Sequence, residues 1–202
     1  MNPIRDQNYF ALDLELNNKS DGTTPKIIEV GIAIGSPVRP NKIHSYNWYL
    51  DPEEPIVPFI TKLTGITDET IRCYSVPHND VASMIGQFIT TYNCFCNPVV
   101  WGGGGEGNDA TELKDEFKER DIDFPFFGRR VIDVKTLYVF NQMVKGKSPS
   151  GGLRKSMISY GLKFDGTPHK ASHDAYNTLK FFFHFLNTQR NIIDAVETLK
   201  TL

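Results

Sequence analysis

The stretch FALDLEL, residues 10–16, places two acids between regularly spaced apolar residues. Alternation of this kind is typical of a half-buried β-strand. Because alternate side chains on a strand point to the same face, we expect Asp13 and Glu15 to project together while the leucines point into the opposite layer. Two neighbouring carboxylates repel each other when partly buried, and a divalent cation relieves the repulsion. The pair therefore suggests a metal site, although a strand with an acidic, solvated face explains an isolated Asp-x-Glu equally simply.

Outward from this strand, the first fifty residues predict an antiparallel meander. Further strands are expected at residues 26–35 and 42–50, with clusters of Asn, Ser, Asp and Gly between them. A Pro-rich connection follows from Asp51, and apolar residues then fall on one helical face over residues 76–92. Beyond it we expect strands at 97–101 and 131–134, and helices at 109–120, 135–144, 153–160, 172–186 and 192–202. This order predicts an α/β fold with a mixed central β-sheet flanked by α-helices.

Length, composition and charge narrow the class of protein. The 202 residues fit one domain, expected to span residues 1–202. No apolar stretch approaches the roughly 18–20 residues that cross a bilayer, and the N-terminus does not resemble a secretory signal, so we expect a cytoplasmic protein without a membrane partner. The net charge of −2 disfavours tight nonspecific binding of duplexes but is compatible with an enzyme whose bound cations hold a polyanionic substrate. The cysteines, Cys73, Cys94 and Cys96, indicate neither a disulfide framework nor a zinc site, and we expect buried or semi-buried thiols.

A second group of candidate residues lies in the segment PHKASHDAYNT, residues 168–178. His169 precedes a predicted helix that carries Asp174 near its first turn, so this segment can deliver a base and a metal ligand to one place. Each residue also has a simpler explanation. An acid in the first turn stabilises a helix by about 0.3–1 kcal/mol, and a lone histidine is often structural. Asp109, at the start of a mid-chain helix, is likewise explicable as a cap.

The simpler explanations do not account for the order of these residues along the chain. Asp-x-Glu on the first strand, an acid at a mid-chain helix start and His-x4-Asp at a late helix together resemble the DEDDh 3′–5′ exonucleases of the ribonuclease H-like fold. That group includes polymerase proofreading subunits and oligoribonucleases. The resemblance runs from Tyr9 to about Leu186 and includes the segment KLTGIT, residues 62–67. Residues 152–169 are similar in layout to RNA 3′-end exonucleases of the Eri-1 type.

The resemblance implies a metal-dependent 3′–5′ exonuclease that hydrolyses single-stranded nucleic acid from its 3′ end, with RNA or short oligonucleotides favoured over DNA. Two divalent cations would serve the reaction, and all-carboxylate ligation favours Mg²⁺ or Mn²⁺ over zinc. Carried over position by position, the metal-binding acids are Asp13, Glu15, Asp109 and Asp174, and the substrate-contacting residues are Leu14, Leu16, Thr64 and Gly65.

The same resemblance makes His169 the general base, a role suited to the ordinary pKa of histidine, near 6.5. His173 competes for this role, but once the helix has begun it points about 100° away from the face of Asp174. Positively charged residues in the same region are candidates for contacts with the substrate backbone, although solvated surface charge explains them equally well: Arg154, Lys155, Lys163 and Lys170. Phe10 and Trp101 are predicted to be core residues rather than base-stacking platforms.

Two features depart from the family's pattern. Leu16-Asn17-Asn18 stands where the family often has Thr-Gly, which leaves contacts to the terminal nucleotide open. The run Gly102–Gly107 before Asp109 is unusually rich in glycine, so this acid is expected to be mobile without substrate. The run also satisfies the G-x-G-x-x-G pattern of dinucleotide-binding enzymes, but it lies mid-chain and lacks a well-placed ribose-binding acid. A second alternative is a nucleic-acid-binding module of the same fold without turnover, which the presence of all five catalytic positions disfavours.

Overall fold

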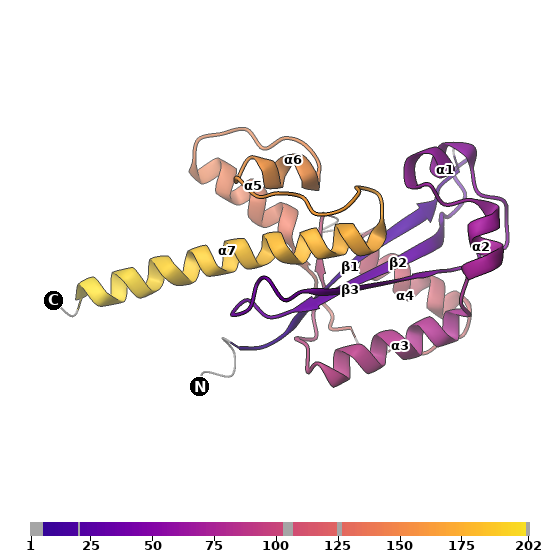
Figure 1. The fold of residues 1–202 in the computed structure, drawn as a ribbon, viewed down its shortest axis with the longest axis horizontal. Helices are drawn as coiled ribbons and strands as arrows, with labels where there is room; N and C mark the ends of the chain where they lie inside the picture. The colour runs from indigo at the N-terminus through magenta and orange to yellow at the C-terminus, as the bar shows by residue number, and fades with distance from the viewer. Residues whose placement is uncertain (1–5, 20, 103–106, 125–126, 201–202) are drawn as a thin grey trace.

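The computed structural model describes residues 6–19, 21–102, 107–124 and 127–200. Its five strands form one sheet in the order β3-β2-β1-β4-β5 (Figure 1). The strands are β1 (Tyr9–Asn17), β2 (Lys26–Gly35), β3 (His44–Tyr49), β4 (Val99–Val100) and β5 (Ile132–Asp133). β1 to β3 form an antiparallel meander, whereas β4 pairs parallel with β1 and β5 parallel with β4. The predicted mixed central sheet of an α/β fold is therefore confirmed.

Helices cover both faces of the sheet (Figure 1). They are α1 (Pro58–Thr64), α2 (Asp68–Tyr74), α3 (His78–Thr91), α4 (Asp109–Glu119), α5 (Val134–Val144), α6 (Leu153–Ile158) and α7 (Ala171–Lys200). On one face, Leu12 and Leu14 of β1 share a core with α3 and α4. On the other, Ala11 packs in a separate core with α5, α6 and α7. The alternation of β1 thus separates two cores, and it assigns Asp13 and Glu15 to the α7 face.

Two short helices occupy the Pro-rich connection, where no helix was predicted. Pro58 stands in the first turn of α1, a position in which the missing N–H of proline costs nothing. Thr67 caps α2 and forms a reciprocal capping box with Thr70. Both helices are too short to show helical periodicity. The only local signs of them in the sequence were these helix-start residues, Pro58 and Thr67.

The two helices predicted at residues 172–186 and 192–202 are wrong as separate elements. One continuous helix, α7, extends from Ala171 to Lys200. The intervening segment NTQRN contains no glycine or proline to end it. The C-terminal part of α7 extends away from the sheet (Figure 1), and its apolar residues are exposed there: Ile192, Ile193, Val196 and Leu199. No helix in the described part of the chain is both long and apolar enough to span a membrane.

The remaining sequence expectations have different outcomes. Strand β4 keeps only two of the five predicted residues. The three cysteines are free thiols, but the expectation that they are buried or semi-buried holds only for Cys94, because Cys73 and Cys96 are exposed. Residues 103–106 of the glycine run lie outside the described residues. A dinucleotide-binding fold is nevertheless contradicted, because the sheet opens with an antiparallel meander instead of parallel βαβ units.

Candidate active site

The central strand β1 carries the first two acids of the site. It lies between β2 and β4, so its backbone is held on both sides, and Asp13 and Glu15 lie opposite Gly31 and Glu29 of β2. A register irregularity follows directly after Glu15. Glu15 is only 8% exposed, which means that its carboxylate has lost most of its contact with water. Two acids are therefore built into the central strand of the sheet.

The start of α7 passes unusually close to the sheet at β2. A Cβ atom on Gly31 would overlap the backbone carbonyl group of Ala171, so only glycine allows this approach. Ala171 and Ala175 are fully buried at the contact. The small side chains of both alanines permit this close packing. The close approach of α7 also brings Asp174 near enough for its charge to act on Asp13.

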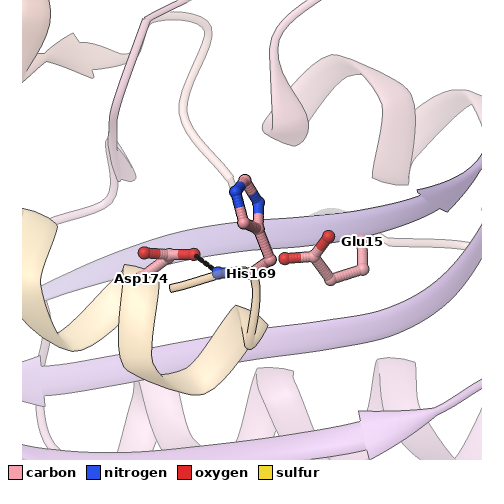
Figure 2. A group of neighbouring side chains, drawn as sticks. All are labelled: Glu15, His169 and Asp174. Atoms are coloured by element: carbon pink, nitrogen blue, oxygen red, sulfur yellow. Dashed lines mark hydrogen bonds between the residues drawn. The ribbon is translucent and has the colours of Figure 1, made fainter. Parts of the chain in front are cut away.

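His169 and Asp174 are joined by the loop that leads into α7. The backbone N–H of His169 donates a hydrogen bond of 2.7 Å to Oδ2 of Asp174 (Figure 2). His169 itself has a φ of 60°, a left-handed conformation that costs a non-glycine residue of order 1–3 kcal/mol unless its surroundings impose it. One potential ligand atom from each of Glu15, His169 and Asp174 lies within 4.8 Å of the others. Segments separated by more than 150 residues thus meet at one point.

Asp109 belongs to α4, a helix that packs on the other face of the sheet from α7. It is the first residue of α4, and the side chain of Asn108 caps that helix by accepting a hydrogen bond of 3.1 Å from Thr111 N. Burial is the largest cause of the raised pKa values of Asp13 and Glu15, and the negative charge of Asp109 raises both further. The structure therefore brings together all four acids that the sequence singled out.

Burial and mutual repulsion dominate the electrostatics of these four acids. Burial, followed by the charges of Asp109, Asp174, Glu15 and Glu29, raises the pKa of Asp13 well above its usual value. Burial is also the largest cause for Glu15, whose pKa rises to about 8, and for Asp109, whose pKa rises to about 7. The pKa of Asp174 is raised by burial too, although the N–H of His169 opposes the change. Carboxylates in this state bind either protons or cations.

Asp13, Glu15 and Asp174 line a cleft of about 660 Å³. Its walls include Trp101 and, from α6, Arg154 and Lys155. The prediction that Trp101 belongs to the core is therefore only half right: one face stacks on Phe181 at 6.0 Å, and the side chain is partly exposed along the cleft. Phe10, by contrast, is fully buried as predicted. An aromatic wall and two cations beside an acidic centre suit a nucleotide strand.

The other candidate residues lie in different places. His173 is engaged by the preceding loop, because its Nδ1 accepts a hydrogen bond of 3.0 Å from Thr167 N. Leu14 lines the cleft. The Thr64 hydroxyl is occupied within its own turn, where it donates to Ile60 O and accepts from Ile66 N, and Gly65 ends α1 with a φ of 75°. Leu16 is partly buried next to the core between β1 and α3.

The donor set fits divalent cations of the hard kind. The potential ligands are carboxylate oxygens with one imidazole beside them, which matches the oxygen preference of Mg²⁺ and Mn²⁺. The raised pKa values reflect burial and repulsion between these carboxylates, and a bound cation would offset that repulsion.

Comparison with known families decides the membership of the chain. The model of a family described as "Exonuclease" (RNase_T) matches residues 10–182. The chain belongs to this exonuclease family. Among curated relatives of the exonuclease, Small RNA degrading nuclease 3 of Arabidopsis thaliana is 24% identical over 178 residues, which cover 88% of this chain and 20% of that protein. A PolC-type DNA polymerase III of Streptococcus agalactiae is 23% identical over 197 residues, covering 98% of this chain and 12% of the polymerase. The exonuclease thus spans a fifth or less of these relatives' length.

Solved structures have the same fold. The nuclease domain of 3′hExo, described as a DEDDh family member bound to rAMP, superposes with a TM-score of 0.73 at 16% identity, covering 91% of this chain and 93% of that chain. Cell-death related nuclease 4 gives a TM-score of 0.73 at 19% identity, over 91% and 65% of the two chains. E. coli exonuclease I in complex with single-stranded DNA gives 0.69 at 15% identity, over 96% and 43%.

Proposed function

We propose that this exonuclease hydrolyses single-stranded nucleic acid from the 3′ end and releases nucleoside monophosphates with the help of two Mg²⁺ or Mn²⁺ ions. The observation that carries the proposal is the convergence of Glu15, Asp174 and His169 in a cleft that Asp13 also lines, with Asp109 close enough for its charge to raise the pKa of Asp13 further, beyond the effect of burial. All five residues lie within the range that the family model matches, residues 10–182. The cations, when bound, neutralise charge that develops on the phosphoryl oxygens.

The four acids would share the binding of the cations. Asp13 offers two oxygens and is repelled by three other acids of the site, so it would contribute to both ions. Glu15 and Asp174 lie beside His169 and would hold the ion nearer the attacking water. Asp109 would contribute to the other ion. Each of these buried carboxylates must be ionised to bind a cation, which the cation's own charge favours.

His169 takes a proton from the attacking water. Its imidazole lies within 4.8 Å of ligand atoms on Glu15 and Asp174, and its backbone is tied to Asp174. His173 is already engaged by Thr167, which supports the assignment of the base to His169. A positioned general base typically contributes 10²–10⁴-fold to the rate.

The substrate class follows from the cleft. Trp101 offers a partly exposed ring on which a base can stack, and Arg154 and Lys155 supply positive charge for phosphates. We favour RNA or short oligonucleotides over DNA, a preference supported by the similarity to a small RNA degrading nuclease and to a nuclease domain bound to rAMP.

The experiment is a degradation time course on 5′-labelled RNA and DNA oligomers of the same sequence, in Mg²⁺, Mn²⁺ or chelator, with Asp13→Asn as the inactive control. We expect metal-dependent, stepwise shortening that is faster on RNA. Faster shortening of DNA would overturn the RNA preference alone. If the protein binds the oligomers but shortens none of them in any of the three conditions, the result would favour a nucleic-acid-binding module of the same fold without turnover.

A further inference from the structure

Glu29 of β2 is a buried carboxylate that the proposed chemistry does not use. It is 1% exposed and lies opposite Glu15 in the strand register. Both of its oxygens accept hydrogen bonds: Oε1 from Asn47 Nδ2 at 2.9 Å and Oε2 from the backbone N of Ala171 at 3.1 Å. The second bond joins the central sheet to a helix 142 residues further along the chain.

The bond to Ala171 meets a need specific to the start of a helix. Ala171 is the first residue of α7, and the first N–H groups of a helix have no partner inside it. The backbone of this residue is also the part of α7 that lies against Gly31. A hydrogen bond and a close backbone contact, two residues apart on β2, therefore hold the helix start at one height above the sheet.

This anchor lies between the two α7-side members of the site. His169 is two residues before Ala171, and Asp174 is three residues after it. Asp13 and Glu15 sit on the neighbouring strand, paired with Gly31 and Glu29. A change in the height of the helix start would alter the distance of His169 and Asp174 from the acids of β1.

We propose that Glu29 is a positioning residue, whose carboxylate anchors the start of α7 and so sets His169 and Asp174 against Asp13 and Glu15. Keeping a carboxylate at this position is costly. Burial raises the pKa of Glu29, and its negative charge repels Glu15. A solvated acid at the surface would have neither effect. The inference rests on the proposed roles of His169 and Asp174.

The test compares Glu29→Ala, Glu29→Asp and Glu29→Gln in steady-state cleavage of a labelled oligonucleotide at saturating Mn²⁺. A misplacement of about 1 Å can cost 10²-fold in rate. We therefore expect Glu29→Ala and Glu29→Asp to lower kcat by roughly 10–100-fold with KM little changed. Glu29→Gln should keep kcat within a few-fold, because its amide oxygen still accepts from Ala171 while the Asn47 amide turns over to meet its NH₂.

Asn47→Ala is the matched control, since it removes only the contact that does not reach α7. It should leave kcat near the wild-type value. Should Glu29→Ala fail to fold, the contrast between Gln and Asp carries the test. Equal loss in the Gln and Asp variants, or wild-type kcat in folded Glu29→Asp, would overturn the inference. The variants His169→Ala and Asp174→Ala separate the positioning role of Glu29 from the proposed function. If these two variants stay active, the proposed function is wrong. If they are inactive while the Glu29 variants keep the wild-type kcat, only the positioning role is refuted.

Discussion

Replacing Glu15 by glutamine should stabilise the metal-free protein. Burial, followed by the charges of Asp174, Glu29 and Asp109, raises the pKa of Glu15 from 4.5 to about 8. Between these values the native state binds more protons than the unfolded chain does, so the free energy of unfolding falls as the pH rises from about 4.5 towards 8. Glutamine keeps the shape and removes the charge.

The size of the effect follows from the shift. Three to four pH units at about 1.36 kcal/mol each set an upper limit near 5 kcal/mol. A buried amide still needs hydrogen bonds, so we expect Glu15→Gln to gain roughly 2–4 kcal/mol at pH 8. For a chain of this length that corresponds to about 5–15 °C in Tm. At pH 5, where the native Glu15 is mostly protonated, the gain should be small.

The assay is thermal unfolding of both proteins at pH 5 and pH 8, in chelator and in excess Mg²⁺. Cation binding stabilises the folded state by mass action, so Mg²⁺ should raise the Tm of the wild type at pH 8 more than that of the variant. Catalysis should be lost in the variant under all conditions. If Glu15→Gln is less stable than the wild type at pH 8 in chelator, the ionised Glu15 does not destabilise the metal-free protein and the reasoning is refuted.

Further predictions separate the roles within the site. His169→Ala should lower the rate by about 10²–10⁴-fold at nearly unchanged metal affinity, and His173→Ala should lower it much less; the reverse ranking would reassign the base. Asp174→Ala should weaken Mn²⁺ binding measured by calorimetry, with partial recovery of activity at excess Mn²⁺, and unaltered Mn²⁺ affinity would remove it from the ligand set. A 3′-phosphate should block degradation while a 5′-phosphate has little effect, and equal rates on both substrates would contradict recognition of a free 3′-hydroxyl. Trp101→Ala should raise KM for oligonucleotides by roughly 5–150-fold, as expected for loss of 1–3 kcal/mol of stacking, and an unchanged KM would exclude stacking on this ring.

Much of the fold and site could be predicted because their signals are local. The alternation around Asp13 and Glu15 is fixed by the period of a strand, and it correctly separates leucines from acids on β1. The order of acids along the chain was also sufficient to indicate the family. These features depend on neighbouring residues or on order, and both are visible in one sequence.

The features that were missed depend on tertiary contacts. Trp101 has one face against Phe181 and one along the cleft, and no local pattern distinguishes such a residue from a core tryptophan. Glu29 looks like an irregularity in an apolar strand until the distant N–H of Ala171 is seen to meet it. The lone acid within the apolar run KIIEVGIAIG was the only available sign.

The most direct test of the account follows a single 3′-terminal linkage. A linear single strand carrying a labelled phosphate in its last linkage, and a circular strand of the same sequence, are incubated with the protein in Mg²⁺ and in chelator. The account predicts that labelled nucleoside 5′-monophosphate is the first product from the linear strand, only when metal is present, and that the circle stays intact. Cleavage of the circle, or release of the label in chelator, would contradict it.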